Sequence, residues 1–118
     1  MIGDNERQLS AAEQELGLRL PDALRMLYLT SNGMYDRSGQ WWVVWPLDRL
    51  VSDTLSAWQE GRLPRALIAF GDDGIGNPFC LRATDDAASL VFRWSWIDNQ
   101  VEQDEGTMAE FLAEWCPR

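Results

Sequence analysis

Residues 70–81 constrain the fold of this chain more than any other segment. They place three glycines, one proline and two adjacent aspartates between two apolar runs. Glycine reaches a positive φ without a Cβ clash, and Asp and Asn tolerate that geometry and hydrogen-bond their own backbone. We therefore expect a tight β-hairpin or a bulged loop here, with a strand on each side.

Hydrophobic spacing predicts helices and strands on both sides of this hairpin. In chain order we expect a helix that begins near Asp4 or at Ser10 and stops at Gly17, a helix from Pro21 to Asn32-Gly33, a strand at 41–45, a helix over 47–58, strands at 66–70, 79–83 and 89–96, and a helix from Thr107 to Pro117. Helices and strands segregated in this way indicate an α+β fold, not a doubly wound nucleotide fold. We expect one domain over residues 1–118, with a small, mainly antiparallel sheet flanked by helices.

The composition excludes most familiar catalytic devices. The chain contains no histidine and no lysine, and all ten basic residues are arginine. Serine or cysteine catalysis of the usual kind is not supported, because a nucleophile needs a base to take its proton. Cys80 and Cys116 lack the spacing of a zinc site and are expected as free, buried thiols. The glycine pattern at 71–76 lacks the lysine and the following helix of a phosphate loop. We expect no enzymatic activity, no cofactor and no metal.

Two pairs of adjacent carboxylates leave a chemical alternative open. Asp72/Asp73 and Asp85/Asp86 could bind a divalent cation or form a glycosidase dyad. Neither pair has the alternating ligand spacing of a calcium loop. Adjacent acids in turns are usually solvated and unpartnered, which is what we expect here.

Negative charge is concentrated in the second half of the chain. The net charge is −9, and residues 66–118 hold −7 of it, from ten acids and three arginines. Asp98, Glu102, Asp104 and Glu105 lie in a loop-like stretch without a neighbouring base and are expected to be solvated. Such a field repels nucleic acid and anionic membrane and attracts a basic partner, although simple solubility also explains it. Without a leader-like start or an apolar run long enough to span a membrane, we expect a cytoplasmic protein.

The seven tryptophans divide into two groups. Trp42 and Trp96 could be either core residues or interface anchors, because a short edge strand exposes one face. The other five fall on predicted core faces: Trp41, Trp45, Trp58, Trp94 and Trp115.

Several short motifs occur in one order along the chain. They are Glu13-x-x-Leu16-Gly17-x-x-Leu20-Pro21, Leu27-Tyr28, Asn32-Gly33, Trp45-Pro46-Leu47 and Ile68-Ala69-Phe70-Gly71-Asp72-Asp73-Gly74-x-Gly76-Asn77-x-Phe79-Cys80-Leu81. In this order they resemble the Smi/Knr-type domain of the SUKH superfamily, from about residue 5 to the end. The resemblance implies an α+β domain without catalytic residues. Arg82 departs from it, because family members commonly carry an acid there, for which Asp85 is a loose substitute.

The resemblance also implies a function. Many bacterial members are immunity proteins that neutralise polymorphic toxins, often nucleases or deaminases, and fungal members act in cell-wall regulation. We expect an immunity protein that blocks a basic toxin by non-covalent occlusion. The alternatives are a scaffold or regulatory interaction module and, more remotely, a small carboxylate enzyme. The oligomeric state is left open. The toxin-binding candidates are Asp98, Glu102, Asp104, Glu105, Asp72, Asp73, Asp85, Asp86, Trp42 and Trp96.

Overall fold

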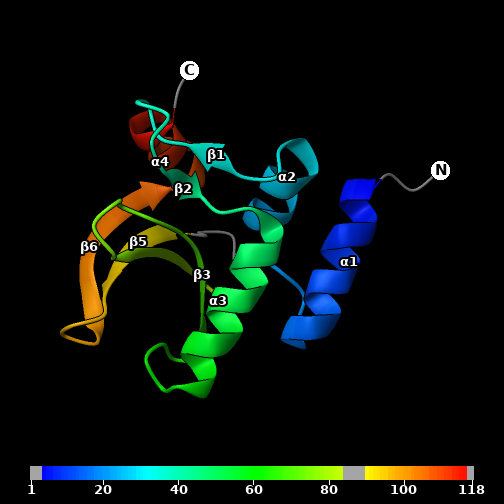
Figure 1. Ribbon diagram of the computed structural model, residues 1–118, viewed down its shortest axis with the longest axis horizontal. Coiled ribbons are helices and arrows are strands. Elements are labelled where there is room, and N and C mark those ends of the chain that lie inside the picture. The colour runs from blue at the N-terminus through cyan, green and yellow to red at the C-terminus, as the bar shows by residue number, and fades with distance from the viewer. Residues whose placement is uncertain (1–3, 84–89, 117–118) are drawn as a thin grey trace.

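The computed structural model describes residues 4–83 and 90–116 and confirms the α+β fold class (Figure 1). The helices of this part of the chain are α1 (Asp4–Leu16), α2 (Asp22–Thr30), α3 (Leu47–Gln59) and α4 (Met108–Trp115). A two-stranded antiparallel ribbon consists of β1 (Met34–Tyr35) and β2 (Trp42–Val44). A four-stranded antiparallel sheet contains, in spatial order, β3 (Leu67–Asp72), β4 (Pro78–Arg82), β5 (Leu90–Ser95) and β6 (Gln100–Thr107).

The elements pack in layers. Figure 1 shows the curved sheet, α3 and α1 one after another, with α4 and the β1–β2 ribbon together at one end. Leu9 of α1, Leu24 of α2 and Leu50 of α3 are fully buried and join one hydrophobic core with Phe70 and Phe79 of the sheet. Each helix turns one apolar stripe inward, as the spacing in the sequence predicts. None of the helices within the described residues is long and apolar enough to cross a membrane.

The expected hairpin joins β3 and β4. The Asp73 amide donates to the Asn77 carbonyl oxygen at 3.1 Å. Gly74 and Gly76 have φ values of 86° and 102°, which side chains rarely adopt. Gly71 has a different reason for being glycine, because a Cβ there would lie 1.7 Å from the Val43 carbonyl oxygen of β2. The hairpin is therefore held against the β1–β2 ribbon by direct backbone contact.

The sequence did not predict β1 and β6. The register between β5 and β6 leaves Glu102 and Glu105 without partners on β5, so β6 carries two extra residues at two irregularities. A β-bulge of this kind shifts the alternation of inward and outward side chains. The stretch therefore lacks the period of two by which a strand is recognised in a sequence, and it resembles a loop. The expectation that residues 98–105 form a loop is wrong from Gln100 onward.

Alanine at three glycines should destabilise the hairpin to different degrees. Gly76→Ala should lower the free energy of unfolding by about 1–2 kcal/mol through the positive φ alone, because its Cβ would meet open space. Gly74→Ala should lower it further, since its Cβ would also lie 2.8 Å from the Trp41 ring. Gly71→Ala should be the most damaging, because backbone must move. Urea unfolding measures the order, and equal midpoints for all three variants would contradict this account.

The aromatic contact between α4 and the sheet predicts a large effect of one truncation. Phe111 is fully buried and meets Phe70 and Phe79 edge to face, with ring centroids 5.5 and 4.7 Å away. Phe111→Ala should cost about 3–5 kcal/mol of unfolding free energy, since it empties a core site. Exposed Glu114 on the same helix is the control, and Glu114→Ala should change stability by less than about 0.5 kcal/mol. Similar urea midpoints for both variants would show that α4 contributes little to the core.

Candidate functional site

The Asp72 carboxylate ties the end of β3 to α3. Its Oδ2 accepts from Trp45 Nε1 at 2.8 Å and lies 3.6 Å from Nη2 of Arg49, while its Oδ1 accepts from the Gly74 amide at 2.8 Å. The Arg49 guanidinium also sits 4.5 Å from the centroid of the Trp45 ring. With only 16% of its side chain exposed, Asp72 is engaged within the fold.

Asp73 orders the turn that follows. Its Oδ1 accepts from the amides of Ile75 and Asn77 at 3.0 and 3.1 Å, and its Oδ2 lies 3.4 Å from Nη1 of Arg93. The Asp73 side chain is 1% exposed. The expectation that Asp72 and Asp73 are solvated and unpartnered is therefore wrong. Backbone amides hold both, together with Arg49 for Asp72 and Arg93 for Asp73.

Arg93 joins Asp73 to a second buried carboxylate. Its Nε lies 4.0 Å from Oε2 of Glu105, and its Nη2 donates to Oε1 of Gln103 at 2.8 Å. Trp115 Nε1 of α4 donates to the other Glu105 oxygen at 2.8 Å. Glu105 was expected to be solvated and without a neighbouring base, and both expectations are wrong. The base is Arg93 of β5. It lies beside Glu105 because β5 pairs with β6, although the two residues are not neighbours in the sequence.

The remaining acids at the β5–β6 hairpin are free. Asp98, Glu102 and Asp104 are exposed, as the sequence predicts. Within residues 4–83 and 90–116, neither Glu102 nor Asp104 forms an ion pair or a side-chain hydrogen bond. Asp98 hydrogen-bonds to Ser95, whose hydroxyl donates to its carboxylate at 3.5 Å and accepts from its amide at 3.1 Å. Three unpaired negative charges therefore lie along the turn and the edge strand β6.

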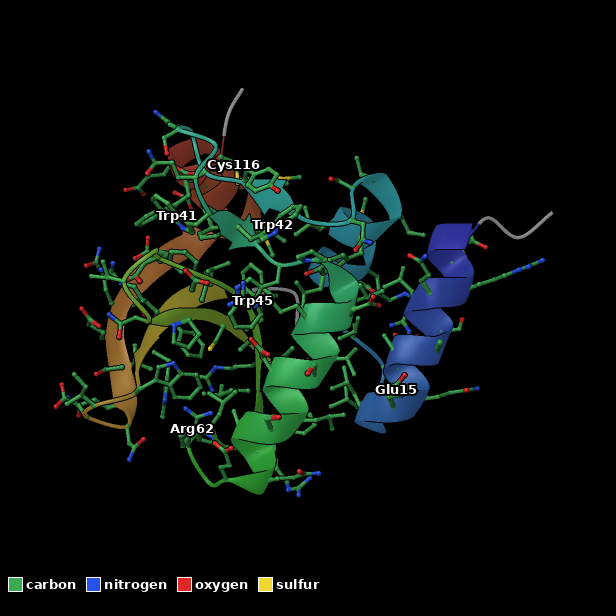
Figure 2. The ribbon with its side chains drawn as sticks, in the orientation of Figure 1. Glu15, Trp41, Trp42, Trp45, Arg62 and Cys116 are labelled. Carbon is green, nitrogen blue, oxygen red and sulfur yellow. The ribbon has the colours of Figure 1, made fainter. Side chains whose placement is uncertain are left out.

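The two uncertain tryptophans are both half-buried. The Trp42 ring stacks on Tyr35, with centroids 4.0 Å apart, and Trp96 lies under the guanidinium of Arg62 at 4.9 Å. Of the five tryptophans expected in the core, three are buried and two are half-buried; they are, respectively, Trp45, Trp58 and Trp94, and Trp41 and Trp115. In Figure 2, Trp41 and Trp42 lie near the β1–β2 ribbon, and Trp45 and Arg62 lie between α3 and the sheet. Trp42 and Trp96 therefore each leave part of the side chain exposed, whereas Trp45 is buried.

Neither thiol is poised to react. Cys80 and Cys116 are free and buried. Burial raises the pKa of the Cys80 thiol, and it raises the pKa of Cys116 against the opposing effect of the Arg37 charge. A raised pKa keeps both groups protonated at neutral pH, so neither supplies a thiolate nucleophile.

The described residues offer little support for a divalent-cation site or a catalytic carboxylate pair. Within them, no group of three carboxylates or cysteines is arranged to hold a metal ion. Asp85 and Asp86, which the sequence analysis also proposed, lie outside the described residues. Arg82, where the resemblance breaks down, is exposed at the end of β4.

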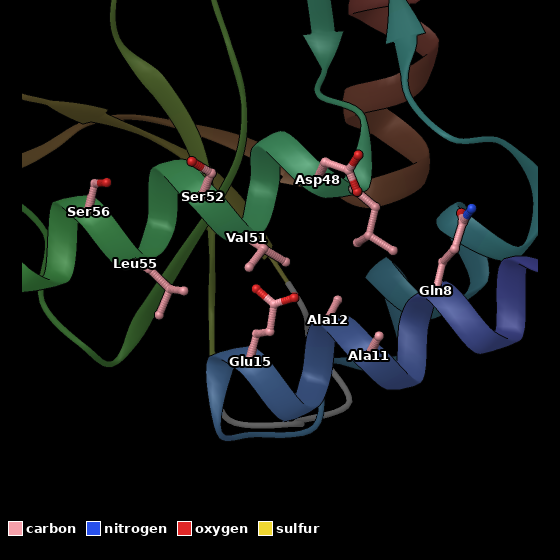
Figure 3. Close-up of a pocket in the computed structure, with 10 residues that line it drawn as sticks. Gln8, Ala11, Ala12, Glu15, Asp48, Val51, Ser52, Leu55 and Ser56 are labelled. Atoms are coloured by element: carbon pink, nitrogen blue, oxygen red, sulfur yellow. The ribbon is translucent and has the colours of Figure 1, made fainter.

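A groove with a volume of about 530 Å³ lies between α1 and α3 (Figure 3). Ala12, Val51 and Leu55 supply apolar surface along it, and the acids Glu15 and Asp48 also line it. No sequence motif pointed to this groove, because its walls come from two helices that are separated by about 30 residues of chain.

A second hollow, of about 310 Å³, lies between α3 and the hairpin turns of the sheet. Trp45 and Arg49 line it from α3 and the residues before it, and Trp96 lines it from the β5–β6 turn. Gly74 and Gly76 bring the β3–β4 turn to the same hollow. Both hairpin turns therefore meet at one place on the surface.

These features define a small α+β domain in which Asp72, Asp73 and Glu105 contact other elements of the fold, while Asp98, Glu102 and Asp104 are exposed. The sequence model of the SMI1/KNR4 family (SUKH-1) matches residues 5–114. The chain therefore belongs to this family, whose domains are in general non-catalytic immunity or regulatory proteins. A search among curated proteins finds no significant match.

Charge reversal of two neighbouring acids of β6 should change the free energy of unfolding to very different degrees. Glu105→Lys should cost about 3–5 kcal/mol of unfolding free energy, because it buries a second cation beside Arg93 and removes the acceptor of Trp115. Asp104→Lys changes the net charge equally on an exposed side chain and should shift stability by less than about 0.5 kcal/mol. Thermal and urea unfolding of both variants test this, and equal losses would show that Glu105 is not structural.

Proposed function

We propose that this chain is a cytoplasmic immunity protein that binds a cognate toxin domain, a nuclease or deaminase with a basic surface, and blocks it without covalent chemistry. The observation that carries the proposal is the set of unpaired acids Asp98, Glu102 and Asp104 along one hairpin of a domain from a generally non-catalytic family. Complementary charge speeds the encounter of a small inhibitor with a basic target.

The organisation of the acids supports binding in preference to general solubility. Asp72, Asp73 and Glu105 are engaged in the fold, so they are left out of the proposed surface. The free acids share one strand and its turn, and residues 98–107 contain no arginine. Because the fold retains them unpaired on an edge strand, they remain available to a partner's lysines and arginines.

Charge reversal of the free acids tests the proposal. The triple variant Asp98→Lys/Glu102→Lys/Asp104→Lys should associate with the toxin domain encoded beside its gene at least about tenfold more slowly at low ionic strength. It should also protect toxin-expressing cells less well, while its melting temperature stays close to that of the parent protein. Association kinetics at two salt concentrations and cell growth are the measurements.

The matched control makes the same change in net charge elsewhere. Glu6, Glu15 and Glu114 are exposed and lie on α1 and α4, so Glu6→Lys/Glu15→Lys/Glu114→Lys should retain fast association. Equal slowing by both triple variants would assign the effect to net charge. It would then contradict a specific role of Asp98, Glu102 and Asp104 in binding. A parent protein that binds no toxin domain and protects no cell would overturn the immunity function and favour a regulatory module.

A further inference from the structure

Two isoleucines at the tips of adjacent hairpins are the most exposed large hydrophobic residues of the described chain. Ile75 in the β3–β4 turn is 83% exposed, and Ile97 in the β5–β6 turn is 91% exposed. In an antiparallel meander, alternate turns lie at the same end of the sheet, and Figure 1 shows both turns on the side away from α1. The two tips therefore point outward from one end of the molecule.

Residues next to both tips line the same hollow. Gly74 and Gly76, the neighbours of Ile75, line the 310 Å³ hollow together with Trp96, the neighbour of Ile97. Single exposed apolar residues are normal on a protein surface. Two of them on neighbouring turns, each next in sequence to a residue that lines this hollow, are candidates for interface anchors.

The fold itself does not need either isoleucine. Carboxylate and backbone hydrogen bonds shape the β3–β4 turn through Asp73, and the Ser95 hydroxyl and carbonyl hold the β5–β6 turn through the amides of Asp98 and Asn99. Both side chains project from hydrogen-bonded turns and expose apolar area to solvent. An ordered tip loses little conformational entropy when it docks.

Planar groups line the 310 Å³ hollow. The Arg62 guanidinium covers the ring of Trp96, and Arg49 covers the ring of Trp45. Asp72 and Asp53 both pair with Arg49, so the arginine charge is balanced within the hollow. Flat, charge-balanced walls suit an aromatic or aliphatic side chain of a partner better than an unpaired ion.

The edge strand beside the tips is poorly suited to strand addition. Glu102 and Glu105 are the two extra residues of β6, and bulges and charges on an edge strand discourage regular pairing with another chain. The exposed acids Asp98, Glu102 and Asp104 instead form a negative rim that complements a basic surface. Recognition would then use side chains at the tips, with electrostatic attraction along the rim.

We propose that Ile75, Trp96 and Ile97, with the acids Asp98, Glu102 and Asp104, form one docking surface, the two-tip surface. Its occupant is a basic protein that inserts one apolar side chain between the tips and sets lysines or arginines against the acidic rim. This inference rests on the proposed function and names the surface through which the toxin domain is bound.

A peptide probe tests the surface without the toxin. Acetylated and amidated Arg-Leu-Arg-Leu is titrated into the isotope-labelled protein, with Glu-Leu-Glu-Leu as the charge-reversed control. We expect saturable NMR shifts of the Ile75 and Ile97 amides and of the Trp96 indole with the basic peptide only. Shifts confined to the groove between α1 and α3, or equal shifts with both peptides, would overturn the proposal.

Paired variants extend the test to the toxin domain. Ile75→Ser/Ile97→Ser should weaken both peptide and toxin binding by about tenfold or more, as expected for loss of anchor residues. Met26→Ser/Leu90→Ser removes two exposed apolar side chains elsewhere and should bind like the parent. Melting temperatures of all variants should agree within a few kelvin, because none of these side chains is buried.

The outcomes separate the two proposals. If the parent neutralises the toxin domain and the isoleucine variant does so equally well, the two-tip surface is wrong and the immunity function stands. If the parent binds no toxin domain but the basic peptide saturates the tips, the immunity function falls and the tips remain a docking surface for a basic partner.

Discussion

The structure depends on a close approach of two backbones, where β2 lies against β3 at Gly71. An ideal Cβ on this residue would stand 1.7 Å from the Val43 carbonyl oxygen, so only glycine permits the contact. The Trp45 amide then donates to the Phe70 carbonyl oxygen at 2.8 Å, which fixes the start of α3 against the sheet. Farther along α3, the Thr54 hydroxyl donates to the Ala69 carbonyl oxygen at 2.9 Å. One strand thereby positions the helix, the ribbon and the hairpin turn beyond its end.

Buried polar groups extend this arrangement across the sheet. Asp73 shapes the β3–β4 turn, Arg93 joins it to Glu105, and Trp115 joins Glu105 to α4. A buried ion pair is weak grounds for stability, because desolvation offsets the attraction. Its geometric effect is clearer: it connects a surface turn to the terminal helix. The acids of this protein thus divide into those that organise the fold and those that stay exposed and without an ion pair among the described residues.

This division bears on how a small acidic domain can recognise a partner. Long-range attraction from unpaired acids accelerates encounter but discriminates poorly between basic proteins. Apolar side chains held on ordered turns supply short-range shape complementarity, which long-range electrostatic attraction does not provide. A family that is generally non-catalytic can diversify its partners through such turns, since loops change more freely than the elements that support them.

The sequence by itself determined the features that are local. Glycine and aspartate spacing predicted the 70–81 hairpin, and apolar periodicity predicted the helices, because backbone sterics and amphipathic packing act over a few residues. Only the tertiary structure decided that Asp104 is exposed while adjacent Glu105 is buried. These neighbours are chemically alike. Their different burial follows from a bulge in β6 and from contacts of Glu105 with Arg93 and Trp115, which lie on other elements. The placement of both hairpin turns beside one hollow was likewise set by the order of strands in the sheet, which no local pattern encodes.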